Sequence, residues 1–364
     1  MINNPIKFGT DGWRGIIAED FTFDNVRICA QAFALYLHKS ELARQGIVIG
    51  YDTRFSSKEF ASAAAEIIAA NGIKVYLCSK AEPTPVVSYG VVAKQAGGAI
   101  VITASHNPGK WNGFKIKSEE GASAPTEVIS EIELNVQTVI DSGKIKRLTL
   151  TEAIDKGLVE YIDLYPVYQA QIARLVDLDG MKNRKLKIAV DSMFGAGAGY
   201  FKALLKDSAF EIVEIKDQPN PAFPGIKQPE PIANNLSDLS KLIKNSEADA
   251  GLATDGDADR IGIMDENGNF LTQLQVYALL ALYLLEVRKE RGAIIKTITT
   301  TAMLDKLGEI YDVPVIETKV GFKYVAPLML EHDAMIGGEE SGGYGLRGHV
   351  PERDALLAGL CFLD

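Results

Sequence analysis

The sequence contains few cysteines, no excess of positive charge and no long hydrophobic run. Its three cysteines, Cys29, Cys78 and Cys361, are far apart, and an odd number of distant thiols fits neither a disulfide framework nor a zinc site. With 38 Lys and Arg against 48 Asp and Glu, the net charge is −10, so the chain lacks the basic surface typical of proteins that bind nucleic acid or anionic lipid. Its longest apolar stretch, residues 276–285, is far shorter than the roughly 20 residues that cross a bilayer. We therefore expect a cytoplasmic protein with no nucleic-acid or membrane partner.

What the sequence does contain is an alternation of predicted helices and strands. Residues 24–44 carry apolar side chains at helical spacing, and GIVIGYD at 46–52 is typical of a buried strand. The alternation continues to the apolar strand AIVIT at 99–103, restarts at KLKIAVDSM (185–193) and restarts again at GAIIKTITT (292–300). This order predicts an α/β protein built from mostly parallel sheets with helices on both faces.

Three similar blocks follow from this alternation. We predict domains at residues 1–155, 156–269 and 270–364, each a mostly parallel sheet flanked by helices, arranged around a central cleft. The boundaries are set by the polar segment 141–157 and the turn DENGN at 265–269, and each has a tolerance of about ten residues. In open α/β sheets, ligands bind beyond the carboxyl ends of the strands. The loops at those ends are therefore the candidates for a functional site.

The loop TASHNPGKWNGFKIK, residues 103–117, carries a candidate nucleophile. Ser105 directly follows a predicted strand, so its hydroxyl can face a cleft. Its neighbour His106 is not assigned as its base from spacing alone, because adjacent side chains diverge and the chain has no G-x-S-x-G motif. Lys115 lies in a short strand-like segment, where a nearby cation or burial would lower its pKa toward acid–base use.

The loop DGDADR, residues 255–260, is a candidate metal site. Asp255, Asp257 and Asp259 alternate along an extended segment, which places three carboxylates on one side. Mg²⁺ suits such a site because it binds carboxylate oxygens and leaves positions for phosphate oxygens. An EF-hand is the alternative, with these residues at positions 1, 3 and 5 and Glu266 at position 12. Arg260 argues against it, since it occupies position 6, where glycine is required, and the preceding segment is a predicted strand.

Two further loops offer groups that bind a ligand. GGEESGGYG (337–345) places Glu339 and Ser341 among glycines, where the backbone comes close to a ligand and carboxylates accept hydrogen bonds from sugar hydroxyls. In FGTDGWRG (8–15), Arg14 can form a fork on a phosphate. The four loops together supply a hydroxyl, a metal site, cations and sugar acceptors, which are the parts needed for phosphoryl transfer to and from a sugar.

The same motifs resemble those of the α-D-phosphohexomutases, the family that includes phosphoglucomutase and phosphomannomutase. The resemblance rests on TASHNP with NGFK, DGDADR, GEESGG, FGTDGWRG and KVGFKYV (319–325), in the family's order over nearly the whole chain. It implies that Ser105 is a phosphoserine whose phosphate oxygen joins Asp255, Asp257 and Asp259 around one Mg²⁺. The other candidate residues for catalysis are Arg14, Lys115, Arg260 and His106, which directly follows Ser105. The candidates for sugar binding are Gly321, Phe322, Glu339 and Ser341.

The resemblance also implies a reaction. A sugar 1-phosphate would receive a second phosphate from Ser105, and the resulting 1,6-bisphosphate would turn over and return a phosphate to Ser105, leaving the 6-phosphate. Glucose 1,6-bisphosphate is then the expected activator, and a phosphosugar the expected substrate. The sequence does not indicate an oligomeric state.

Two departures from the family pattern affect this expectation. The family's fourth domain carries an R-x-S-G-T-E-P loop that binds the non-reacting phosphate, and no such motif occurs in the sequence. The alternative to a mutase is therefore a truncated phosphosugar-binding or slow phosphatase module, because losing that loop should raise KM and lower kcat. Gly343 stands where members that use both glucose and mannose often have histidine, so the sugar loop favours glucose.

Overall fold

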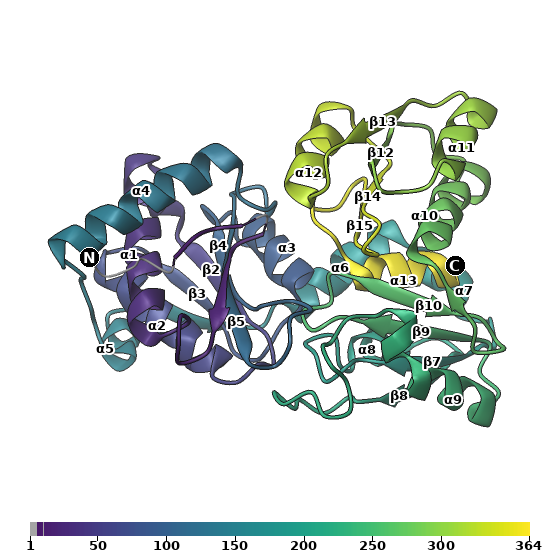
Figure 1. Ribbon diagram of the computed structural model, residues 1–364, viewed down its shortest axis with the longest axis horizontal. Helices are drawn as coiled ribbons and strands as arrows, with labels where there is room; N and C mark the ends of the chain where they lie inside the picture. Colours follow the sequence, from purple (N-terminus) through teal and green to yellow (C-terminus); the bar gives the residue numbers. More distant parts are fainter. Residues whose placement is uncertain (1–5, 10) are drawn as a thin grey trace.

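The computed structural model describes residues 6–9 and 11–364, which form three α/β domains (Figure 1). The first domain contains a six-stranded sheet with the order β1-β5-β4-β2-β3-β6. Its strands are β1 (Trp13–Ile16), β2 (Ile47–Tyr51), β3 (Val75–Cys78), β4 (Ala99–Ile102), β5 (Trp111–Lys117) and β6 (Val159–Ile162), and its helices are α1 (Phe23–Lys39), α2 (Ser57–Ala70), α3 (Thr84–Lys94), α4 (Thr126–Ser142) and α5 (Leu150–Asp155). The 3₁₀ turn η1 spans Leu42–Gln45.

The second domain contains a five-stranded sheet with the order β11-β10-β9-β7-β8. Its elements are α6 (Tyr165–Leu175), α7 (Leu178–Met181), β7 (Lys187–Asp191), α8 (Tyr200–Leu204), β8 (Glu211–Ile215), η2 (Ala233–Asn235), α9 (Ser237–Ser246), β9 (Ala250–Thr254), β10 (Ile261–Met264) and β11 (Phe270–Leu271). The strands β9 and β10 pair antiparallel, with Ile261 opposite Thr254. The acidic loop 255–260 is thus the tip of a hairpin.

The third domain contains a four-stranded sheet with the order β13-β12-β14-β15. Its elements are α10 (Gln273–Leu282), the π-helical turn η3 (Tyr283–Val287), β12 (Ile294–Thr297), α11 (Met303–Tyr311), β13 (Val315–Thr318), α12 (Phe322–Glu331), β14 (Ile336–Gly338), β15 (Tyr344–Leu346) and α13 (Ala355–Leu363). The helix α13 packs against β15 of its own domain and against β9 and β10 of the second, so it joins the two (Figure 1).

In each sheet, parallel strands form the centre and one edge, and antiparallel strands form the other edge. In the first sheet β4, β2, β3 and β6 run parallel, while β5 and β1 are antiparallel additions. All five residues of β2 and all four of β4 are buried, because helices cover both faces of a parallel sheet. The predicted α/β fold is confirmed. β6 and β11 extend the first and second sheets a few residues beyond the predicted boundaries at 155 and 269.

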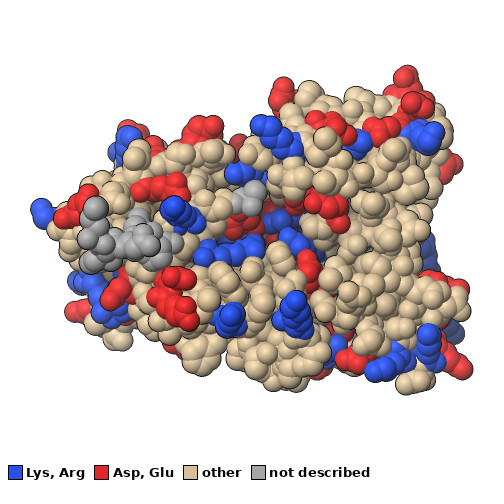
Figure 2. All heavy atoms as spheres, viewed as in Figure 1, with Lys and Arg blue, Asp and Glu red and all other residues tan. Residues whose placement is uncertain are grey.

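The packing of these layers determines where the chemically active loops lie. The loops after β4, β9 and β14 all leave carboxyl ends of strands, and they meet between the three domains. Figure 2 shows a hollow there in which Lys and Arg atoms gather beside acidic ones. In the part of the chain that the structure describes, no helix has both the length and the apolar character needed to cross a membrane.

Candidate active site

Ser105 lies at the carboxyl end of β4, buried to 1% exposure, in a strained backbone conformation. Its φ of 51° is in the left-handed region, which costs a residue with a side chain about 1–3 kcal/mol. Its backbone N–H donates to the hydroxyl of Thr103 at 2.9 Å, and that hydroxyl donates to Asp52 Oδ2 at 2.6 Å. These contacts hold the serine hydroxyl toward the second domain.

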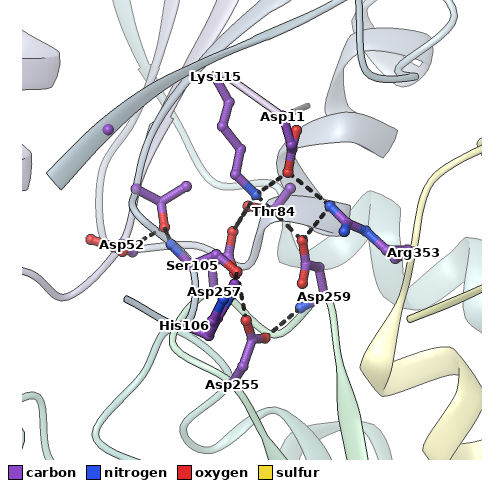
Figure 3. Close-up of polar contacts among 12 residues, drawn as sticks. Asp11, Asp52, Thr84, Ser105, His106, Lys115, Asp255, Asp257, Asp259 and Arg353 are labelled. Carbon is purple, nitrogen blue, oxygen red and sulfur yellow. Dashed lines mark hydrogen bonds and ion pairs between the residues drawn. The ribbon is translucent and has the colours of Figure 1, made fainter. Parts of the chain in front are cut away.

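The hydroxyl of Ser105 meets the acidic hairpin there (Figure 3). It donates a hydrogen bond to Asp255 Oδ2 at 2.8 Å. One carboxylate oxygen from each of Asp255, Asp257 and Asp259 lies within 4.8 Å of the others, and all three residues are fully buried. The EF-hand alternative is excluded, because this loop joins two antiparallel strands and not two helices.

The unused oxygens of this triad fit a metal ion. Among the described residues, Asp257 Oδ1 and Asp259 Oδ1 are buried and have no hydrogen-bond partner, which is costly unless a cation binds them. Burial and the neighbouring carboxylates raise the pKa of Asp255 well above its usual value. Burial also opposes ionisation of Asp257, but Lys115 and the hydroxyl of Thr84 outweigh it and lower the pKa of Asp257. A divalent cation with oxygen ligands is thus the group that the triad can hold.

Lys115 is a buried cation that offsets part of the negative charge of this cluster. Its ammonium lies 2.7 Å from Asp11 Oδ2, 2.9 Å from Asp257 Oδ2 and 3.3 Å from Asp259 Oδ2. Burial alone would lower the pKa of Lys115, but the three carboxylates outweigh it and raise that pKa above its ordinary value. The expectation of a lowered pKa is therefore wrong: a cation among three carboxylates keeps its proton.

His106 lies beside the nucleophile without a strong contact to it. Its Nδ1 is 3.4 Å from the hydroxyl of Ser105. Burial, followed by the charges of Arg260 and Arg14, lowers the pKa of His106 to about 2. The imidazole is therefore neutral at physiological pH, and it can exchange hydrogen bonds with a phosphate but adds no positive charge.

A pocket of about 420 Å³ opens above these groups and is lined by all three domains. The first domain contributes Arg14 and His106, the second Arg260, and the third Gly321, Phe322, Glu339 and Ser341, so these predicted residues lie around one cavity. Arg14 donates to Asn107 Oδ1 at 2.5 Å, and Arg260 donates to Glu230 Oε1 at 3.2 Å. Both guanidinium groups keep further N–H donors for an anionic ligand.

The third-domain loop presents acceptors on one side of this pocket. Glu339 accepts a hydrogen bond from Arg353 at 3.2 Å, and burial raises its pKa. The hydroxyl of Ser341 is buried and has no hydrogen-bond partner within the described chain, so it is available to a ligand. Glu340, by contrast, accepts from the hydroxyl of Thr297 at 2.9 Å and stabilises the loop itself.

The sequence reasoning missed two residues that connect the domains at this site. Arg353 pairs with Asp11 and Asp259 at 2.8 Å each and with Glu339 at 3.2 Å, so one guanidinium joins three domains. Asp11 also accepts from Lys115. Asp11 stands inside the quoted motif FGTDGWRG, and Arg353 in the charged segment PERD that precedes the apolar helix α13. The signal for Arg353 was this cluster of charge directly before a buried helix.

Comparison with known proteins relates this arrangement to a family. Family models match the chain in three segments: phosphoglucomutase/phosphomannomutase α/β/α domain I over residues 5–141, domain II over 166–268 and domain III over 273–364. The chain belongs to the phosphoglucomutase/phosphomannomutase family. The resemblance found in the motifs is thus confirmed. Members of this family are phosphohexomutases, which are isomerases.

Individual members of the phosphoglucomutase/phosphomannomutase family are similar over nearly the whole chain. A phosphoglucomutase/phosphomannomutase from Thermococcus kodakarensis is 33% identical, over 96% of this chain and 75% of that protein. A protein from Thermococcus gammatolerans, named probable phosphoglucosamine mutase, is 30% identical over 98% of this chain and 75% of its own length. A crystal structure from Thermus thermophilus has a TM-score of 0.90 and 37% identity, covering 99% of this chain and 79% of that one.

Proposed function

We propose that this chain moves a phosphoryl group between the two ends of a hexose phosphate, with Ser105 as the covalent carrier. The observation that carries the proposal is the contact of 2.8 Å between the hydroxyl of Ser105 and Asp255, beside the Asp triad. A phosphate on Ser105 would stand next to a cation bound by that triad and beside His106, which lines the pocket. This is the placement that serine-mediated phosphoryl transfer needs.

Each half-reaction exchanges one P–O bond for another. The bond between phosphorus and Oγ of Ser105 breaks, and a bond to the free hydroxyl of the sugar phosphate forms. That hydroxyl gives up its proton and Ser105 regains one, so the product is a sugar bisphosphate and a free serine. The bisphosphate then turns over and returns its other phosphate to Ser105.

The residues of this chain divide the work of holding the reactants. Asp255, Asp257 and Asp259 would hold Mg²⁺, and the ion would draw negative charge from the phosphoryl oxygens. Lys115 remains protonated and holds the triad in place. Two sets of residues line the pocket. Arg14, His106 and Arg260 would contact the phosphates of the ligand. Gly321, Phe322, Glu339 and Ser341 would contact its sugar.

The sugar is proposed from the third-domain loop and the names of the relatives. The relatives include a phosphoglucomutase/phosphomannomutase and proteins named as phosphoglucosamine mutases. We propose glucose phosphate as the preferred substrate, with mannose phosphate second. A side chain at Gly343 would start 2.3 Å from Cδ of Arg353, so this chain has no room for a histidine there. The buried free thiols of its cysteines support a reducing compartment, and we propose the cytoplasm.

Labelling of Ser105 tests the proposal directly. Incubation with glucose 1,6-bisphosphate and Mg²⁺ should add one phosphate, which tandem mass spectrometry should locate on Ser105. Ser105→Ala should abolish the label, while Ser130→Ala, on the exposed face of α4, should keep it. Folded, Mg²⁺-saturated protein that takes up no phosphate contradicts the proposal.

Turnover assays separate the mutase from its alternative. Glucose 1-phosphate, mannose 1-phosphate and glucosamine 1-phosphate should be compared, with glucose 1,6-bisphosphate as activator. A mutase converts them to 6-phosphates with little free phosphate. Release of inorganic phosphate without a 6-phosphate product would identify the slow phosphatase.

A further inference from the structure

A buried arginine beneath the Ser105 loop lies outside the roles assigned so far. Arg54 follows β2 in the sequence YDTR and is 3% exposed. Its Nη2 donates to the carbonyl oxygens of Ser105 and Asn107 at 2.6 Å each, and its Nη1 donates to those of Pro108 and Trp111 at 3.0 Å each. All four N–H groups of its fork are therefore spent on one loop.

The neighbours of Arg54 fix its orientation. Its Nε faces Asp52 Oδ2 at 3.1 Å, and Asp52 itself accepts from the hydroxyls of Ser57 and Thr103 at 2.8 and 2.6 Å. Thr103 in turn accepts the N–H of Ser105. Asp52 and Arg54 thus hold both backbone polar groups of the serine: Asp52 its N–H, through the hydroxyl of Thr103, and Arg54 its carbonyl oxygen.

We infer that Arg54, held by Asp52, is the positioning residue that keeps Ser105 in its left-handed conformation and its hydroxyl against the metal triad. A non-glycine residue at a φ of 51° persists only where its surroundings over-determine it. Charge-assisted hydrogen bonds to four carbonyl oxygens of this loop supply that constraint, since each is stronger than a neutral one. Only a planar fork can reach four acceptors at once.

The same segment also fixes the loop relative to the second domain. The hydroxyl of Thr53 donates to the carbonyl oxygen of Phe194 at 2.7 Å, and the guanidinium of Arg54 lies 5.1 Å from the ring centre of Phe223. Residues 52–54 therefore contact both the Ser105 loop of the first domain and the second domain, which are the two parts joined by the hydrogen bond between Ser105 and Asp255. The effect of Arg54 on catalysis rests on the proposed function. Its effect on the conformation of the loop rests only on its hydrogen bonds to the backbone.

Arg54→Lys is the informative variant, because it keeps the charge and removes the fork. We expect phosphorylation of Ser105 by glucose 1,6-bisphosphate to slow by about 100-fold, since misplacement by about 1 Å has that effect. The Kd for glucose 1-phosphate and the affinity for Mn²⁺ should stay within about threefold, because the pocket and the triad are unchanged. Arg147→Lys, which alters a surface pair with Glu66, is the matched control and should leave every value unchanged.

Hydrogen exchange followed by mass spectrometry gives a readout that does not depend on activity. In Arg54→Lys, amides of residues 104–111 should exchange at least about tenfold faster, while β9, β10 and β14 keep their protection. Faster exchange with an unchanged phosphorylation rate would overturn the inference. A lost phosphorylation rate with unchanged exchange would also overturn it, because Arg54 would then affect the reaction without holding the loop. If wild-type protein is not phosphorylated, the proposed function fails, and unchanged exchange in the variant would separately overturn the positioning role.

Discussion

Gly256 and Ser105 approach so closely that a Cβ on Gly256 would lie 2.5 Å from the carbonyl oxygen of Ser105. Real Cβ atoms do not come this near to a backbone oxygen. Because Gly256 has no side chain, the loop at 255–260 can contact the loop that carries Ser105. The contact between Ser105 and Asp255 depends on it.

Gly256→Ala should separate the two loops. We expect the rate of Ser105 phosphorylation to fall by about 10- to 100-fold, because the hydroxyl and the triad lose their alignment. Quench-flow labelling with glucose 1,6-bisphosphate measures this rate. Gly157→Ala is the control, since its φ of 68° makes alanine unfavourable while nothing lies within 4 Å. It should lower stability and leave labelling intact, and equal labelling by both variants would refute the prediction.

Asp257→Asn should remove the response of the protein to Mg²⁺. In the wild type we expect the free energy of unfolding to rise by about 2.7 kcal/mol at a Mg²⁺ concentration 100 times its Kd, because the ion binds only the folded triad. The variant lacks one anionic ligand and should show little of this gain. Urea titrations with Mg²⁺ or with a chelator measure the difference. Asp24→Asn, on a side chain that is 89% exposed, should respond as the wild type does; a full response in Asp257→Asn would argue against this metal site.

Glu82 should make the fold less stable as pH rises toward neutrality. Burial raises its pKa to about 7, although Tyr200 donates a hydrogen bond to it. The folded state therefore binds more protons than the unfolded state between the ordinary pKa of about 4.5 and about 7, so stability falls as pH increases through that window and levels off above it. The total change is about 3 kcal/mol.

Glu82→Gln should remove that pH dependence. The variant should be more stable than the wild type at pH 8, and the difference should shrink toward pH 5, because the amide has no proton to lose. Urea denaturation at several pH values, in chelator, measures it. Glu309→Gln, at an exposed position of α11, should change the profile little. If the stability of the wild type changes with pH no more than that of Glu82→Gln, the prediction is contradicted.

Arg353→Ala should destabilise the protein strongly. It leaves the buried Asp259 and Glu339 and the largely buried Asp11 without the cation that joins them, and such a loss costs about 3–5 kcal/mol. Asp11→Asn combined with Arg353→Ala should be less destabilised than the sum of the two single variants, because the pair interacts directly. Urea denaturation of the four proteins gives the coupling free energy. Arg147→Ala, in an exposed pair, should cost less than about 1 kcal/mol, and strictly additive effects of Asp11 and Arg353 would refute the direct pairing.

Much of the architecture could be predicted because the local signals were strong. The strands expected at 46–52 and 99–103 form as β2 (Ile47–Tyr51) and β4 (Ala99–Ile102), since each is a short, continuous apolar run. The helix expected at 24–44 ends at Lys39, because Ser40 caps it and Glu41 adopts a left-handed φ of 64° before a 3₁₀ turn. The site itself was predicted in part: loops after strands gave Ser105 and the three aspartates.

The remaining groups could not be found in this way, because their partners are distant in the chain. Arg54 acts on carbonyl oxygens 51 to 57 residues away, and nothing in the four letters YDTR reveals which carbonyls these are. Lys115 was expected to have a lowered pKa from burial, but Asp11 and the hairpin carboxylates supply the opposite effect. Long-range charge pairing is a property of the folded arrangement and leaves no local pattern.

The bond between Arg353 and Asp11 joins positions 342 residues apart. During synthesis on the ribosome, the serine loop and the first sheet are made early, and the hairpin that carries the aspartates follows. Arg353, whose guanidinium connects Asp11 and Asp259 to Glu339, is translated after all three of these residues. A nascent chain therefore holds these loops without the guanidinium that joins them until residue 353 has left the exit tunnel.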